Sequence, residues 1–225
     1  MKSKILAICV GLSALMNAAC SVDTVGSSQI NAQSIHENYS ITYDADKNTT
    51  EAWAQFRVGG STGTTVELEA PSRVSANNVP MAKTNFLGTY YSLNMAGLVT
   101  NVTINYIDGN GGRRDYPAQV LPANLAITST TVSKSMPYTA TVDVPGLRYG
   151  EYAYLQITQS LPDTYIIASA TVSSSGVVTI PASETAKLRV GQPAQVVVSR
   201  TFRPGMTASL VTEAISHRFT IQVGQ

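Results

Sequence analysis

The chain has 225 residues, with 15 basic against 14 acidic side chains, a formal net charge of +1 and only two cysteines. This near-neutral balance, without any basic run, argues against a nucleic-acid partner and against charge-driven binding to an anionic lipid surface. The length suffices for a sizeable core, in one large domain or in two of about 100 residues.

Residues 1–19 have the features of a secretory signal peptide. Lys2 and Lys4 give a positive start, residues 5–15 form a short apolar run, and small residues precede Cys20. The apolar run is too short for a membrane-spanning helix, which needs about 20 residues. The sequence therefore predicts export, with the signal removed from the mature chain.

The end of this signal, Leu15-Met16-Asn17-Ala18-Ala19-Cys20, resembles the lipobox of bacterial lipoproteins. In that family the cysteine thiol takes a diacylglycerol and the signal is cut just before it, which leaves an acylated N-terminus. The resemblance implies that Cys20 is lipidated and that the lipid attaches the protein to the membrane. Because Ser21 rather than Asp follows the cysteine, it also implies the outer membrane. Asn17 departs from the apolar residue usual there, and ordinary cleavage with Cys20 as a free thiol is the alternative.

Residues 20–37 are small, polar and aperiodic, which predicts a flexible tether after the lipidated Cys20. From Tyr39 onward, apolar residues alternate with polar ones in short segments separated by turn signals, which indicates antiparallel strands with one buried face. Residues 165–172 and 176–180 predict one such hairpin. Helical periodicity is nearly absent, and only residues 182–188 suggest a helical turn.

This strand pattern occurs twice, over residues 38–118 and 124–225, with a connector at 119–123. About seven short strands in each repeat resemble tandem immunoglobulin-like sandwiches, although neither repeat has the Cys…Trp…Cys spacing of true immunoglobulin domains. The predicted fold is all-β, with two tandem Ig-like antiparallel β-sandwiches after the signal peptide and tether.

The sequence supplies little that indicates catalysis. It contains no nucleophile elbow, zinc-protease motif or phosphate-binding loop. We expect His36 to be solvated at the end of the tether and His217, which shares parity with Phe219 and Ile221, to point inward. A pair of carboxylates that meet only in space is the alternative that the sequence leaves open. We therefore predict a protein that is not an enzyme and needs no cofactor.

The segment Asp44-Ala45-Asp46-Lys47-Asn48 places oxygen ligands at alternating positions, as a calcium ion requires. Thr49 stands where an EF-hand loop needs Gly, so that motif fails. The main interpretation is a hairpin turn whose Asp and Asn side chains cap their own backbone. The weak alternative is a metal site formed by Asp44, Asp46 and Asn48 at the junction between the two domains.

Trp53 lies opposite the apolar positions of its segment and is either covered by another part of the chain or offered to a partner. Tyr152 and Tyr154 alternate with Ala153 and Leu155, so we expect both tyrosines outside. Tyrosines suit a recognition face, but they also suit ordinary strands. Trp53, Tyr152 and Tyr154 are the candidate ligand contacts.

These features together predict a lipid-anchored envelope protein at the outer membrane. Its expected role is non-catalytic binding or adhesion to an envelope or extracellular protein or glycan. The alternative is a structural or assembly component of an envelope complex, docked through the edges of its sheets.

Overall fold

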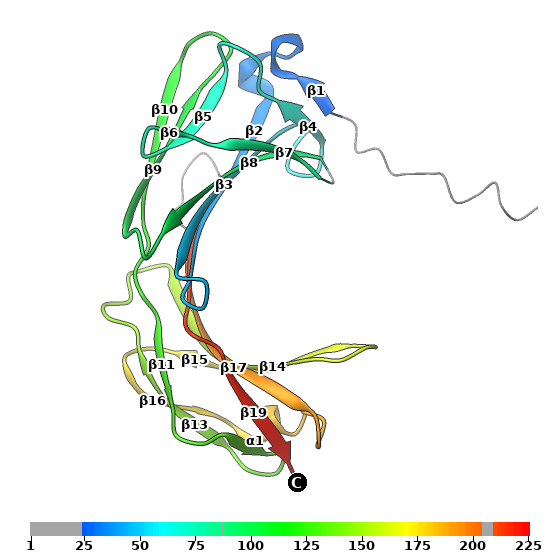
Figure 1. Cartoon of the computed structure of the whole chain (residues 1–225), viewed down its shortest axis with the longest axis vertical. Coiled ribbons are helices and arrows are strands. Elements are labelled where there is room, and N and C mark those ends of the chain that lie inside the picture. Colours follow the sequence, from blue (N-terminus) through cyan, green and yellow to red (C-terminus); the bar gives the residue numbers. More distant parts are fainter. Residues whose placement is uncertain (1–23, 87, 204–208) are drawn as a thin grey trace, which may run out of the picture.

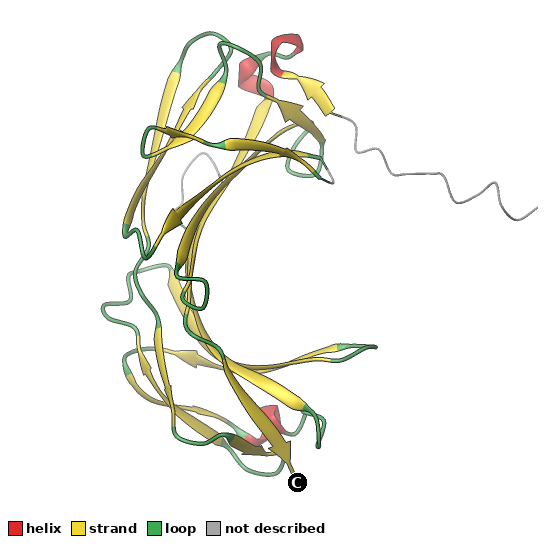
Figure 2. Cartoon of the chain, viewed as in Figure 1, coloured by secondary structure: helices red, strands yellow, loops and turns green. Residues whose placement is uncertain are grey.

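The computed structural model describes residues 24–86, 88–203 and 209–225, which form an all-β protein. Figure 2 shows strands throughout these ranges, with only short helical turns between them. The predicted fold class is confirmed, because each alternating segment buries one face of a strand and exposes the other. None of these helical turns has the length and apolar character of a membrane span.

Within the described ranges, twelve strands form one large sheet that runs through both halves of the molecule. Its main path is β1-β4-β3-β2-β18-β17-β14-β15, and the other four strands pair beside this path. The strands of the large sheet are β1 (Thr24–Gly26), β2 (Ile35–Asp44), β3 (Thr49–Val58), β4 (Thr64–Glu67), β7 (Ala82–Asn85), β8 (Thr89–Ala96), β12 (Thr131–Ser133), β14 (Glu151–Ser160), β15 (Tyr165–Val172), β17 (Pro193–Phe202), β18 (Ser209–Ile215) and β19 (Phe219–Gly224).

Two smaller sheets pack against the large sheet, one in each half. The four-stranded sheet contains β5 (Arg73–Ala76), β6 (Val79–Pro80), β9 (Asn101–Ile107) and β10 (Arg113–Gln119). The three-stranded sheet contains β11 (Asn124–Ile127), β13 (Tyr138–Asp143) and β16 (Gly176–Ile180). The helical turns are η1 (Ser27–Gln29), η2 (Ala32–Ser34) and α1 (Ala182–Thr185), and α1 lies within the predicted turn at 182–188.

Both small sheets cover the same face of the large sheet, so the molecule is a crescent with the small sheets on its convex side (Figure 1). In the first half, the ring centroids of Phe56 on β3 and Tyr106 on β9 are 4.7 Å apart. The buried residues of both halves form one continuous cluster. The other face of the large sheet lines the inside of the crescent, and we call it the concave face. The Ig-like topology of the two layered halves remains a prediction.

The strand β18 joins the two halves. It runs parallel to β2 through seven residue pairs, from Ser209 beside Asn38 to Ile215 beside Asp44, and it also pairs with β17. Most strand pairs are antiparallel as predicted, but β18 with β2, β1 with β4 and β12 with β19 are parallel. The first of these arises because residues 209–215 return from the second half to lie beside β2. For the same reason, residues 124–225 do not form a sandwich separate from residues 38–118.

The beginning of the described chain is ordered, unlike the predicted tether over 20–37. Thr24–Gly26 pairs in parallel with β4, two short helical turns follow, and β2 begins at Ile35. In η2, the Asn31 side chain accepts a hydrogen bond from the Gln33 backbone N–H. Local caps and pairing with a distant strand order this polar segment, which lacks the alternation that would reveal strands in the sequence.

The predicted hairpin over 165–172 and 176–180 is also wrong. The first of these segments is β15, which pairs with β14 in the large sheet, and the second is β16, which pairs with β13 in the small sheet. The turn between them carries the chain from one layer to the other. The predicted connector lies between the end of β10 at Gln119 and the start of β11 at Asn124.

Candidate functional site

The predicted contact residues Tyr152 and Tyr154 lie on β14 and point away from the core. Ala153 and Leu155 are fully buried, whereas Tyr152 is 55% and Tyr154 is 36% exposed. Because successive side chains of a strand point to opposite faces, the two tyrosine rings belong to the concave face. The sequence-based prediction of their orientation is confirmed.

Trp53 lies on the same concave face, although it belongs to the other half. Strand register connects it to Tyr152, because partners in register point to the same side of a sheet. Val211 and Glu213 are two residues apart on β18 and therefore also share this face. The connecting residues between Trp53 and Tyr152 are, in order, Ser40, Val211, Glu213 and Thr201. The structure thus brings the three predicted contact residues together on one continuous surface.

The Trp53 indole is partly exposed and packs beside Tyr90 of β8. The two ring centroids are 6.1 Å apart, with an angle of 30° between the ring planes. Tyr90 is also partly exposed and lies on the same face. The Trp53 ring is therefore held by a neighbour on its own face and remains in contact with solvent, which leaves it accessible to a partner.

Tyr165 and Ile167 of β15 extend the concave face toward the outer edge of the sheet. Tyr165 is 60% and Ile167 is 42% exposed, and they stand opposite Ser160 and Thr158 of β14. These two residues were not among the contact residues predicted from the sequence. The signal available in the sequence was strand alternation. Ala168 and Val172 point to the buried face, and the same alternation places Tyr165 and Ile167 outside.

Glu213 lies in the middle of the concave face, where β18 runs between β2 and β17. Its neighbours in register are Thr42 and Thr201, neither of which is charged. Within the described residues, Glu213 forms no hydrogen bond or ion pair. Burial raises the pKa of its carboxyl group, and the positive charge of Arg218 offsets this effect only in part. Nothing in the sequence around Glu213 distinguishes this carboxylate from other surface acids.

The weak metal candidates do not converge on a common point. Asp44 and Asp46 both face the Arg218 guanidinium, with Arg218 Nη1 at 3.1 Å from Asp44 Oδ1 and at 2.7 Å from Asp46 Oδ2. Burial opposes ionisation, but the hydrogen bonds from Arg218 lower the pKa of both carboxyl groups. Asn48 instead adopts a positive φ of 48° in the β2–β3 turn and accepts a hydrogen bond from Tyr43. These acids thus bind an internal cation, and the described residues contain no group of three or more metal-ligating acids, histidines or cysteines.

The histidines differ from the sequence expectation. His217 does not point inward, because its side chain is 67% exposed and its Nδ1 atom lies 3.1 Å from Asp46 Oδ1. It lies between β18 and β19, so the parity of Phe219 does not extend back to it. His36 is not in a tether but on β2, opposite Arg57.

An enclosed ion-pair network lies where the two halves meet. Arg200 Nη2 lies 2.7 Å from Glu151 Oε2, and both side chains are almost inaccessible to solvent. Arg200 also donates hydrogen bonds to the backbone carbonyls of Pro122, Pro145 and Gly146. One guanidinium thereby fixes the connector, the loop before β14 and the start of β14.

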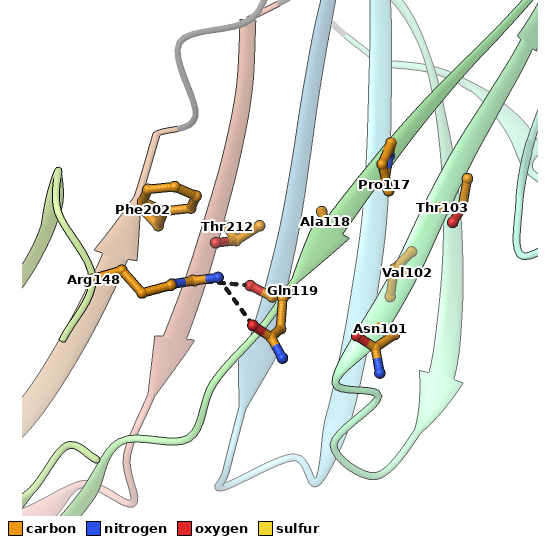
Figure 3. Close-up of a pocket in the computed structure, with 9 residues that line it drawn as sticks. All are labelled: Asn101, Val102, Thr103, Pro117, Ala118, Gln119, Arg148, Phe202 and Thr212. Carbon is orange, nitrogen blue, oxygen red and sulfur yellow. Dashed lines mark hydrogen bonds between the residues drawn. The ribbon is translucent and has the colours of Figure 1, made fainter. Parts of the chain in front are cut away.

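A pocket of about 410 Å³ adjoins this network. Arg148 crosses it from the second half, stacks over the Phe202 ring and donates to the side-chain and backbone oxygens of Gln119 (Figure 3). Arg148 also donates to Glu151. Two of the guanidinium nitrogens of Arg148 are therefore engaged by Gln119 and Glu151, and we interpret the pocket as part of the junction.

The Glu37 carboxylate is the buried acid of the first half, and its oxygens are already engaged. Tyr39 and Tyr116 donate their hydroxyl protons to Oε2 at 2.8 and 2.7 Å, and Arg114 pairs with Oε1. Burial and the nearby Glu37 charge raise the pKa of Tyr116 to about 12. This network joins β2 to β10 across the core, and its saturated hydrogen bonding is typical of a structural role.

Cys20, the predicted lipidation site, lies outside the described residues. Comparison with known proteins finds no protein-family model and no curated protein that matches this chain.

Proposed function

We infer that this protein is a lipid-anchored, non-catalytic binding module of the bacterial envelope. It is attached to the outer membrane through Cys20 and contacts a protein or glycan partner through the concave face.

One observation carries this inference: exposed aromatic side chains from both halves share a single face of one sheet. Trp53 and Tyr90 stand in the first half, and Tyr152, Tyr154 and Tyr165 stand in the second. Tyrosine and tryptophan provide a large contact area with few rotatable bonds, and they are enriched in recognition surfaces. The junction network fixes the two halves, so that these side chains are presented together and little conformational entropy is lost on binding.

Site-specific photo-crosslinking in living cells tests this function. A photoreactive phenylalanine analogue replaces Tyr154 on the concave face or, as the matched control, Val177 on β16. Val177 is 73% exposed and lies in the small sheet on the convex side. We expect a discrete crosslinked product from position 154 and none from position 177.

A glycan array probed with the purified mature chain covers the other partner class. On the array, Trp53→Ala combined with Tyr154→Ala should reduce binding at least about tenfold without changing the melting temperature by more than a few degrees. In the crosslinking experiment, Trp53→Ala should weaken the product formed from position 154. Binding that is unaffected by this double substitution would contradict the concave face as the contact surface.

A role in assembly is the second candidate, and the edge of β15 favours it. This eight-residue strand pairs only with β14 among the described strands and ends the path of the large sheet. Such an edge can receive a strand from another protein. Ser169→Pro would block strand addition there and would also remove the hydrogen bond from the Ser169 N–H to Glu184. It would leave Trp53 and Tyr154 intact, so the two candidates respond to different substitutions.

A further inference from the structure

The concave face has a charge pattern that indicates the chemistry of its partner. Glu213 and Glu51 stand on either side of Thr42 in one row across three neighbouring strands. Two strand spacings separate them, about 10 Å. This distance is too long for both carboxylates to bind one metal ion directly, but a long basic side chain above Thr42 can face both.

Neither carboxylate forms an ion pair within the part of the chain that the structure describes. The neighbouring acids Asp44 and Asp46 are ion-paired with Arg218, and Lys47 lies 3.9 Å from Asp44. Glu51 and Glu213 have no such partner within the described ranges. The middle of the concave face therefore carries two carboxylates without ion-pair partners, and the charge of Arg218 counteracts the raised pKa of Glu213 only in part.

Because Glu213 is partly buried, the absence of an ion-pair partner reduces the stability of the folded protein. The side chain is partly buried, and desolvation disfavours its charged form. A Gln or Thr at this position would remove that cost, because neither side chain has a charged form to desolvate. Groups that reduce stability in this way are typical of binding sites, where a partner supplies the missing interaction.

The residues around Glu213 favour a polypeptide over a sugar. Val211 and Ile215 flank it on β18, and both are partly exposed on the same face. Aliphatic side chains match apolar side chains of a protein partner better than they match sugar hydroxyls. Tyr152 lies in the same row beyond Thr201, where an aromatic ring can also attract a cation.

We propose that the concave face docks a polypeptide segment whose lysine or arginine side chain pairs with Glu213, while Glu51 attracts the same group from across Thr42. This proposal rests on the proposed binding function and specifies its partner class. It requires no metal and no covalent step.

Random decapeptide pools on beads test the proposal with the full mature chain. One pool has a fixed central lysine, and the matched pool has a fixed central glutamate. We expect the lysine pool to retain the protein about tenfold better, as is typical of charge-assisted contacts in a partly desolvated interface. Glu213→Gln should remove most of this preference, and Glu51→Lys, at an exposed position, should reduce or reverse it. Glu184→Gln, which removes a carboxylate at the edge of β15, three strands away from β18, should leave the preference unchanged.

The outcomes separate the proposal from the function on which it rests. Equal retention by both pools that is lost in the Trp53→Ala, Tyr154→Ala variant would overturn the basic partner and retain the concave face as a binding surface. Retention by neither pool, together with binding to neutral glycans that needs Trp53, would overturn the polypeptide as well. A lysine preference that persists in folded Glu213→Gln and Glu51→Lys proteins would overturn the assigned carboxylates. Folding of each variant is verified by its melting temperature.

Discussion

Arg200 and Glu151 form a bidentate ion pair inside the junction between the two halves, with Nε–Oε1 and Nη2–Oε2 distances of 2.8 and 2.7 Å. Both side chains are at least 98% buried. Arg200 comes from β17 and Glu151 from the start of β14, and the guanidinium also reaches the connector at Pro122. The pair therefore lies at the point where the curvature of the crescent is set.

The first prediction concerns Glu151→Gln. This substitution leaves the Arg200 charge buried without its partner, and we expect a loss of about 3–5 kcal/mol in the free energy of unfolding. Urea denaturation followed by the fluorescence of Trp53, the single tryptophan, measures it. Glu184→Gln removes the charge that pairs with the exposed Lys187, while the amide oxygen can still accept a hydrogen bond from the Ser169 N–H, so it should cost less than about 1 kcal/mol. Equal losses in the two variants would contradict the importance of the buried pair.

The second prediction is that Glu151 and Glu213 make opposite contributions to the pH dependence of stability. Burial opposes ionisation of Glu151, but hydrogen bonds from Arg200 and Arg148 lower its pKa to about 2. Glu151 therefore stabilises the fold above its unfolded pKa of about 4.3, and this stabilisation is lost as the pH falls toward 2. Glu213 has a raised pKa, so its contribution is most favourable below the unfolded value and declines as the pH rises through the raised one.

We accordingly expect Glu213→Gln to raise the melting temperature at pH 7 and to have little effect near pH 4. Thermal unfolding of the wild type and this variant across that range measures the difference. A variant that is less stable than the wild type at pH 7 would show that the Glu213 carboxylate is stabilised by the fold after all. The comparison needs no partner, and it is therefore independent of the binding assays.

The third prediction is that calcium has no effect on stability. Arg218 occupies the carboxylates of Asp44 and Asp46, so added calcium at about 1 mM, a concentration that suits weak extracellular sites, should not change the melting temperature. Arg218→Gln should lower the melting temperature, because Asp44 and Asp46 then repel each other without a cation between them. A rise in the wild-type melting temperature with calcium, but not with magnesium, would restore the metal-site interpretation.

The fourth prediction concerns the anchor. Cys20→Ser removes the thiol that would carry the lipid, and we expect the protein to move from the membrane fraction to the soluble fraction and to lose labelling by radioactive palmitate. Cys9→Ser, within the predicted signal, should change neither. Membrane association and labelling that persist in Cys20→Ser would favour ordinary signal cleavage.

The sequence predicted the strands and their outward residues well where alternation is local. Tyr152 and Tyr154 could be oriented because Ala153 and Leu155 lie between them, and the turn at Asn48 followed from its position between two strands. The joining of Trp53 and Tyr152 on one face could not be predicted, because it depends on the pairing of β18 with β2. Strand pairing between residues about 170 positions apart leaves no periodic signal in either segment.

The junction and the free carboxylate were unpredictable for related reasons. Nothing in the sequence around Arg200 or Glu151 distinguishes them from surface charges, because their burial results from the layers that close over them. The inward orientation predicted for His217 was wrong for a different reason. The alternation of β19 was extended back into a loop, where side chains do not alternate. Glu213 shares its strand with apolar neighbours, and its isolation is apparent only when the strands on both sides are known.

The pairing of β18 with β2 also sets the order in which the sheet can be completed during synthesis. A chain is synthesised from its N-terminus, so β2 is made early and has β3 as its neighbour on one side only. The strand that covers its other edge begins at Ser209, and nearly the whole chain must be made before that edge is closed. Until then the first half presents an open strand edge to other chains. A translation product that stops before residue 209 would therefore lose more than its own C-terminal strands, because the oldest part of the sheet would remain unfinished.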